Sequence, residues 1–398
     1  MLNRKNKGII SRADWIFLLF FAGFCALFTI MESINGRLWT NDFRVYYEAT
    51  RDFFAGNNPY KHNYGLDTGY FKYAPFTLYL FSPQCLFSYG IGQIVHILLL
   101  AFSFMYSVMN MRLLAERFAI FGSKRVPSGM LYLLFACVAI HITREMHLGN
   151  INLLLLLFFN LGLSALLNNK ELPLAIYWSL MIVLKPIMIL ILLPLLFKGR
   201  IKTILIMAGF GLFFFLFPAL HVGFKGNWIL WTDWFQSIVA HGQYLSSFNT
   251  IDSLVKNHTG LPIGWLAALL CLLVLIAWMI NDIYRLKKPA SDTYLAWTAI
   301  FAAFIPNFFI TDTEHFLLSL PLIWLLLTAL INRGKWYHWT GFFIGMSLFS
   351  FNSSDLLGNL SDFVFDHGLL GIGNLVFIAT FLGIRTEKKI AENEKATR

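Results

Sequence analysis

The sequence predicts an all-α polytopic membrane protein. Of its 398 residues, 58% are hydrophobic and 17% aromatic, whereas only 13% are charged. The mean hydropathy of +0.64 lies well outside the range of ordinary soluble domains. The formal net charge of +10 comes from short Lys and Arg clusters between apolar runs. Such clusters are typical of charges that set membrane topology, and they form no stripe suited to nucleic acid.

Apolar runs of spanning or near-spanning length divide the chain, since a helix needs about twenty residues to cross a bilayer. The first run follows a basic stretch and has no small-residue cleavage site, so we expect it to be retained as a helix. Together with the helices expected in two longer apolar regions, residues 73–111 and 172–198, these runs give about 12 transmembrane helices. The runs lie at about 13–34, 127–143, 150–168, 201–221, 262–282, 292–310, 315–332, 336–352 and 367–384.

The distribution of Lys and Arg resolves the two longer regions, because basic residues in short loops stay on the cytoplasmic side. We expect residues 73–111 to cross once, with 73–87 forming a short re-entrant or half helix. We expect residues 172–198 to form a two-helix hairpin with Lys185 at its outer tip. Both termini are then cytoplasmic. The basic residues that this topology places inside are Arg4, Lys5, Lys7, Arg12, Arg112, Arg117, Lys124, Arg125, Lys198, Arg200, Lys202, Arg285, Lys287, Lys288, Arg333, Lys335, Arg385, Lys388 and Lys389.

The same topology gathers the polar segments on the extracytoplasmic side. Residues 35–72 form an amphipathic first outer loop, and residues 222–261, which are rich in Trp, form a second and interfacial loop. The loop from Arg144 to Asn150 and the turn from Asp312 to His315 lie on that side too. No internal repeat or soluble segment is visible, so residues 1–398 are expected to form a single domain.

Lys185 indicates a functional site from the sequence alone, without reference to any protein family. A Lys inside an apolar segment costs about 2.5–3.5 kcal/mol on insertion scales, so it normally faces an aqueous cavity or an anion. Pro186 disfavours helix at the residue before it. The chain is therefore expected to break at Lys185 and to present its ammonium group, for which a phosphate is a natural partner. The alternative is a Lys that snorkels from a helix end.

Several short motifs follow one another in a fixed order. They are Asp42 with Val45-Tyr46, Gly56 to Tyr60, Tyr73 to Pro75, Gly149-Asn150-Ile151-Asn152, Lys185-Pro186 and His315. Together they resemble glycosyltransferase family 87, membrane enzymes of the GT-C class that include polyprenyl-phosphate-mannose-dependent α-mannosyltransferases. The resemblance covers residues 13–330. Thr311 to Glu314 departs from the Ser-Trp that the family often has before this His.

The resemblance implies a GT-C fold and an inverting transfer of a hexose, with mannose favoured. The donor would be a polyprenyl monophosphate sugar, and the acceptor a lipid-linked or envelope glycan. The reaction would take place on the extracytoplasmic face of the bacterial cytoplasmic membrane.

The resemblance also implies roles for individual residues. Asp42 would be the catalytic base, since a positioned carboxylate can remove the acceptor proton; an Asp at a helix start can also merely cap it. Lys185, Arg144 and His315 would bind the donor phosphate. The sugar and acceptor pocket would comprise Tyr46, Tyr47, Tyr73, Asn150, Asn152 and Asn249. The alternative is that these residues have structural roles, as interface anchors, helix caps or members of an interfacial aromatic belt.

No metal or cofactor is expected, because neither an Asp-x-Asp motif nor a phosphate-binding Gly-rich loop is present. The four cysteines lie in apolar segments without CxxC spacing, which indicates neither disulfides nor zinc. Two other functions stay open. A lipid-linked glycan polymerase or ligase would carry paired Arg residues in late outer loops. A transporter or flippase would show two related halves with matching broken helices, whereas the sequence shows one break, at Lys185.

Overall fold

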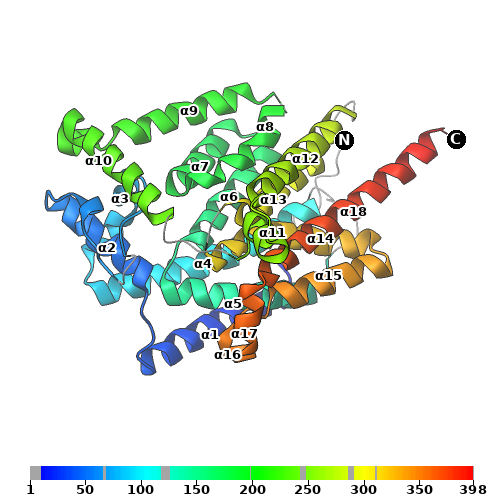
Figure 1. Cartoon of the computed structure of the whole chain (residues 1–398), viewed down its shortest axis with the longest axis horizontal. Coiled ribbons are helices and arrows are strands. Elements are labelled where there is room, and N and C mark those ends of the chain that lie inside the picture. Colours follow the sequence, from blue (N-terminus) through cyan, green and yellow to red (C-terminus); the bar gives the residue numbers. More distant parts are fainter. Residues whose placement is uncertain are drawn as a thin grey trace.

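The computed structural model describes residues 10–65, 69–117, 126–197, 199–242, 248–285, 291–309 and 312–397. Within these ranges the chain is helical apart from loops and an isolated β-bridge between Asn63 and Tyr70. Figure 1 shows the helices gathered in one bundle, with α2 and α3 at one side and the C-terminal helix α18 at the other. The predicted fold class, an all-α polytopic membrane protein, is confirmed.

Six helical segments in the described part of the chain are long and apolar enough to cross a membrane. They are α1 (Arg12–Ile34), α4 (Tyr89–Arg117), α5 (Gly129–Leu148), α12 (Gly264–Arg285), η4 (Thr313–Ser319) continued by α14 (Leu320–Arg333), and α18 (Leu369–Thr397). Shorter apolar helices are α6 (Asn152–Leu167), α7 (Glu171–Leu184), η3 (Pro186–Leu192) with α8 (Leu193–Phe197), and α13 (Ser291–Phe308). The expected total of about 12 crossings stays a prediction.

Residues 89–117 run through the bundle once, as the basic residues predict. At one end of the bundle Arg112 on α4 forms an ion pair of 2.5 Å with Asp14 on α1. At the other end the Thr40 amide, just after α1, donates to the His147 carbonyl on α5 at 2.9 Å, and the Thr40 hydroxyl bonds to that of Tyr89 at 3.1 Å. We call these the Asp14 end and the Asp42 end. The segment before α4 consists of two short pieces, α3 (Thr77–Phe81) and η2 (Ser82–Leu86).

The apolar stretch around Lys185 is the predicted hairpin. Lys185 has an extended backbone (φ −138°, ψ 101°) between α7 and η3. The two arms return to the same end, because Glu171 at the start of α7 pairs with Arg200 at 3.7 Å and with Lys202 at 3.2 Å, just beyond α8. Lys185 therefore lies at the turn between the arms.

Close packing of α6 against α7 holds this hairpin in place. A Cβ at Gly162 would collide with the Trp178 ring, so only glycine permits this approach. The Trp178 indole donates to the Phe159 carbonyl at 3.2 Å. The first turn of α6, which carries Asn152, is thereby fixed beside the tip of the hairpin.

Amphipathic helices fill the two expected outer loops. Residues 35–72 contain α2 (Asn41–Phe54) and η1 (Pro59–Lys61). Residues 222–261 contain most of α10 (Ala219–Gly242) and all of α11 (Ile251–Thr259). Helix α10 is bent by 88° from α9 (Ile201–Leu216) and exposes Phe224, Trp228 and Phe235, which fits an interfacial segment.

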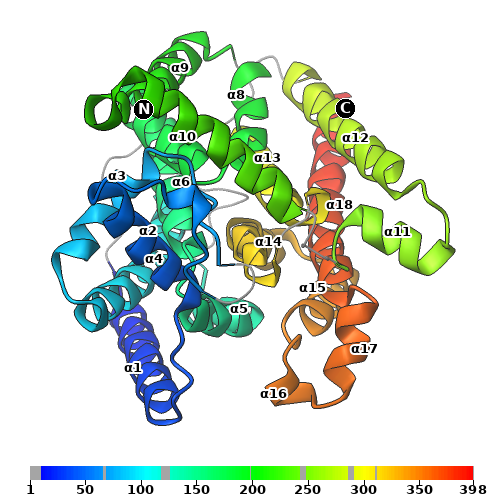
Figure 2. The ribbon, with the colours of Figure 1, turned by 60° about the vertical axis from the view of Figure 1, so that its left-hand side comes forward.

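Two short helices near the C-terminus were not predicted. After α15 (Trp336–Phe349), the chain forms α16 (Ser354–Leu357) and α17 (Leu360–Asp366) before entering α18. Figure 2 shows α16 and α17 projecting from the bundle at the same end as the tip of α1.

Some residues used for the topology lie outside the described residues. They are Arg4, Lys5, Lys7, Lys124, Arg125, Lys198, Lys287 and Lys288, together with Thr311 and the side chains of Arg285, Lys388 and Lys389.

Candidate functional site

The start of α2 is pinned to its neighbours by an unusual backbone. Thr40 adopts a left-handed conformation (φ 41°), which is unfavourable for a β-branched residue and persists only where the surroundings hold it. The Gln93 side chain donates to its hydroxyl at 2.7 Å. Gly149 (φ 66°) ends α5, and a Cβ there would lie 2.8 Å from the Cβ of Phe43. These contacts fix the first turn of α2, and with it Asp42, against α4 and α5.

Asp42 is a partly buried carboxylate surrounded by charged groups. Burial, followed by the negative charge of Glu314, raises its pKa to about 7, while the positive charges of Lys72 and Lys185 oppose the rise. Asp42 lies in the first turn of α2, whose N-cap residue Thr40 makes no side-chain cap bond. Asp42 and Lys185, far apart in the chain, thus lie within electrostatic reach of each other.

The Lys185 ammonium group is held by two side chains. It donates to Asn152 Oδ1 at 2.9 Å and to His315 Nε2 at 2.7 Å. Since an ammonium group can only donate, His315 must accept through Nε2 and carry its proton on Nδ1, which lies 3.2 Å from the Asp312 carbonyl. The ammonium group therefore has a defined direction.

Glu145 holds the side chain of Asn152 in position beside Lys185. Its carboxylate accepts from Asn152 Nδ2 at 2.8 Å and from the Leu153 amide at 3.0 Å. Glu145 and Asn152 are fully buried. Glu145 thus orients the Asn152 amide so that its oxygen faces Lys185.

Two tyrosines and an asparagine form the neighbouring wall. The hydroxyls of Tyr46 and Tyr73 share a hydrogen bond of 2.9 Å, and both oxygens lie 3.4 Å from Asn150 Oδ1, which accepts the proton that this bond leaves free. Burial raises the pKa of both tyrosines well above the ordinary value, so both remain neutral hydroxyl groups. Asn150 Nδ2 in turn donates to Glu314 Oε1 at 3.3 Å. We use the name Asp42 cluster for a set of ten residues: Asp42, Tyr46, Lys72, Tyr73, Asn150, Asn152, Lys185, Asp312, Glu314 and His315.

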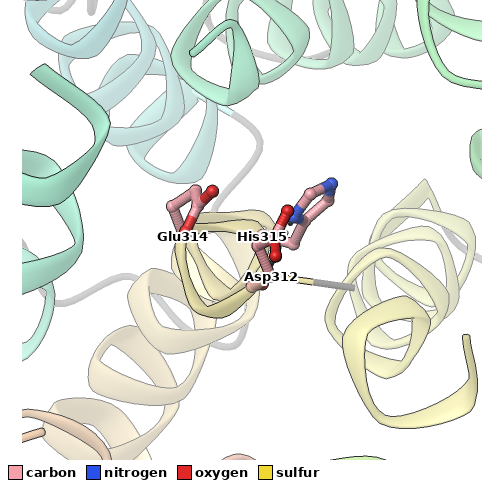
Figure 3. A group of neighbouring side chains, drawn as sticks. All are labelled: Asp312, Glu314 and His315. Carbon is pink, nitrogen blue, oxygen red and sulfur yellow. Dashed lines mark hydrogen bonds between the residues drawn. The ribbon is translucent and has the colours of Figure 1, made fainter. Parts of the chain in front are cut away.

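Arg144 lies at the edge of the Asp42 cluster and does not join Lys185. Its Nε donates to Glu314 Oε2 at 3.1 Å, and about half of its side chain (51%) is exposed. Figure 3 shows Glu314 on one side of the turn, with Asp312 and His315 on the other. Of the predicted phosphate ligands, Lys185 and His315 are therefore together, and Arg144 lies beyond Glu314.

The turn could in principle offer metal ligands, because single ligand atoms of Asp312, Glu314 and His315 lie within 4.8 Å of one another. The Glu314 carboxylate, however, is bonded by Arg144 and Asn150, and His315 Nε2 is bonded by Lys185. Cationic and N–H donors thus occupy the positions that a metal would need, so the geometry fits a hydrogen-bond network.

Tyr47 and Asn249 lie apart from the Asp42 cluster. The Tyr47 hydroxyl donates to the Phe87 carbonyl at 2.8 Å and ties α2 to the start of α4. Asn249 Oδ1 accepts from the Gly371 amide at 3.1 Å and its carbonyl accepts from Asn307 at 3.0 Å. These contacts hold the two side chains against neighbouring helices, and their role in a sugar pocket stays a prediction.

Four charged residues of the site were not picked out from the sequence. Glu145 could have been found as a carboxylate inside an apolar helix, which is rare without a function. Asp312 and Glu314 lie beside His315. Two carboxylates directly before an apolar helix also indicate a functional site. Lys72 precedes the Tyr73 motif but has no distinguishing pattern in the sequence.

Comparison with known proteins identifies the family. The sequence model of glycosyltransferase family 87 matches residues 71–305, which include Tyr73, Asn150, Asn152 and Lys185. No curated protein and no solved structure matches the chain. Because the match spans more than half of the sequence, the protein is a membrane glycosyltransferase that belongs to glycosyltransferase family 87.

Proposed function

We propose that the protein is an inverting GT-C enzyme that transfers a hexose, with mannose as the first candidate, from a polyprenyl monophosphate donor. The acceptor is a lipid-linked or envelope glycan on the extracytoplasmic face of the bacterial cytoplasmic membrane, and both termini face the cytoplasm. Family membership supports glycosyl transfer. The observation that carries the finer proposal is the approach of Asp42 and Lys185, which supplies a base and a phosphate ligand in one site.

The reaction is a single displacement. Asp42 takes the proton of the acceptor hydroxyl, and the hydroxyl oxygen attacks the anomeric carbon from the side opposite the phosphate. The bond between that carbon and the phosphate oxygen breaks, and its electron pair leaves with the polyprenyl phosphate. Lys185, directed by Asn152 and His315, neutralises the charge that develops on the departing oxygen.

A lipid-linked monophosphate suits the position of Lys185. Lys185 lies at the turn of an apolar hairpin, and the residue is partly exposed. One cation with neighbouring hydrogen-bond groups matches a single phosphate and leaves the prenyl chain in apolar surroundings. This geometry therefore supports a donor that arrives from the bilayer.

A donor-dependence assay tests the proposal. The purified protein in vesicles is incubated with radiolabelled polyprenyl-phosphate-mannose and extracted membrane lipids, and the product linkage is determined. We expect label to enter a lipid or glycan product with inverted configuration. Extension only from a diphosphate-linked glycan would support a polymerase, and movement of the donor without a covalent change would support a transporter.

The rate should depend on the ionisation of Asp42. Because the pKa of Asp42 is about 7, the fraction of the active carboxylate increases as pH rises through that value. We expect kcat/KM to rise about tenfold per pH unit below pH 7 and to level off above it. The donor, a phosphodiester, does not titrate in this range. A profile that is flat between pH 5 and pH 8 would remove Asp42 from the role of base.

A further inference from the structure

A polar cavity opens at the Asp42 end of the bundle, outside the Asp42 cluster. Its volume is about 490 Å³, which falls within the range of small-molecule pockets. Its walls come from the end of α1, the last turns of α5 and the unpredicted segment 352–365. Figure 2 shows α1 on one side and α16 with α17 on the other. Of the predicted site residues, only Arg144 lines this cavity.

The lining is rich in groups that both donate and accept hydrogen bonds. Uncharged polar side chains come from Thr143, Asn352, Ser353, Ser354 and Ser361. Hydroxyl and amide groups of this kind match the alternating donors and acceptors of a sugar.

Charged groups of both signs also line the cavity, and several of them pair with one another. His147 Nδ1 lies 2.8 Å from Glu32, and Arg37 lies 3.9 Å from the same carboxylate. Asp362 faces the cavity from α17. The balance of charge favours a polar, polyhydroxylated ligand over a strongly ionic one.

Arg144 connects the cavity to the Asp42 cluster. Its half-exposed guanidinium lines the cavity, while its Nε binds Glu314 on the other side. Glu314 is the charged group with the largest effect on Asp42. The Arg144–Glu314 ion pair therefore joins the cavity to the Asp42 cluster.

Apolar residues border the cavity on the elements that form it. Helix α1 exposes Ile30, Met31 and Ile34 near its end, and α16 and α17 expose Leu356 and Phe363. These residues are suited to contact with lipid chains. A ligand with a polar head and a hydrocarbon tail could place the head in the cavity and the tail along this border.

We propose that the cavity binds the sugar headgroup of an amphiphilic acceptor, with the hydrocarbon chain lying against α1 and α16–α17. This proposal rests on the proposed function and names the route by which the acceptor reaches the reaction. The donor phosphate, held by Lys185 and His315, lies on the other side of Glu314. The acceptor headgroup thus docks on one side of the Glu314 turn, and its reacting hydroxyl passes the Arg144–Glu314 pair to meet the donor and Asp42.

The test uses n-decyl α-D-mannopyranoside as the acceptor probe and polyprenyl-phosphate-mannose as the donor. Ser361→Trp places a large ring in the cavity, whereas Leu360→Trp places the same ring at an exposed site next to it on α17. We expect Ser361→Trp to raise the KM for the probe at least about tenfold, which corresponds to about 1.4 kcal/mol. The donor KM and the slow hydrolysis of the donor should stay unchanged, and Leu360→Trp should match the wild type.

Photo-cross-linking with a diazirine analogue of the same probe locates binding independently of turnover. Labelling of residues 140–148 or 352–365 that unlabelled probe suppresses would support the cavity, even if the wild type transferred no mannose and the donor proposal failed. An unchanged probe KM in Ser361→Trp, or labelling confined to other segments in a protein that transfers mannose, would overturn the acceptor route and leave the donor proposal intact.

Discussion

Replacing Asp42 with Asn should lower kcat by about 10²- to 10⁴-fold while leaving donor affinity nearly unchanged, because the amide cannot take a proton from the acceptor. The amide keeps the size of the side chain, and the proposed phosphate ligands Lys185 and His315 are unchanged. The measurements are single-turnover transfer from radiolabelled donor and equilibrium binding of that donor. Asp52→Asn on the same helix is the matched control, since Asp52 accepts a hydrogen bond from Tyr64 at 2.8 Å outside the Asp42 cluster.

The stability of the Asp42→Asn variant separates catalysis from folding. The pKa of Asp42 in the folded protein, about 7, lies above its ordinary value of 3.8. Ionisation of Asp42 therefore lowers the free energy of unfolding. The stability that the protonated carboxyl contributes is fully present below pH 3.8 and is lost as pH rises through 7. At pH 8 the Asn variant should unfold at the same or a higher temperature than the wild type. A folded variant that turns over at a near-normal rate would exclude Asp42 as the base.

Replacing Lys185 with Met should weaken donor binding and lower kcat by about 10²- to 10³-fold, in line with the loss of one positioned donor at a developing negative charge. Met keeps the length and the apolar stem but removes the hydrogen bonds to Asn152 and His315. Donor binding and single-turnover rates measure the two effects separately. Lys202→Met is the matched control, because Lys202 is exposed and pairs with Glu171 at the far end of the hairpin.

The result for Lys185→Met distinguishes a phosphate ligand from a snorkelling side chain. A snorkelling Lys contributes through its own solvation, so its loss would leave donor affinity and turnover unchanged. Unchanged kinetics in a folded Lys185→Met protein would therefore contradict the phosphate role. A loss shared equally by Lys202→Met would point to a general effect on the hairpin.

The sequence predicts much of the architecture because its signals are physical and local. Long apolar runs give helices, and the break at Lys185 follows from the steric effect of Pro186 on the residue before it. The single passage of residues 89–117 follows from charge, since Arg112 can lie beside Asp14 only if α4 runs the full length of the bundle. These elements need no knowledge of distant contacts.

Contacts between distant segments explain what the sequence could not predict. Glu314 binds Arg144 and Asn150 from another part of the chain, and Arg144 therefore lies between this carboxylate and the cavity beside α1. Tyr47 and Tyr46 are adjacent, yet the helix turns their hydroxyls to different partners, Phe87 and Tyr73. The short helices α16 and α17 lack an apolar run long enough to be recognised.

The length of α7 has a consequence for where the chemistry occurs. Its 14 residues rise about 21 Å, which is less than the thickness of about 30 Å that the hydrocarbon layer usually has. In the proposed topology, an ammonium group at the end of such a short arm would lie below the outer headgroups. A polyprenyl-phosphate sugar, the proposed donor, would then meet it beneath the membrane surface, without its polyprenol being lifted out of the bilayer.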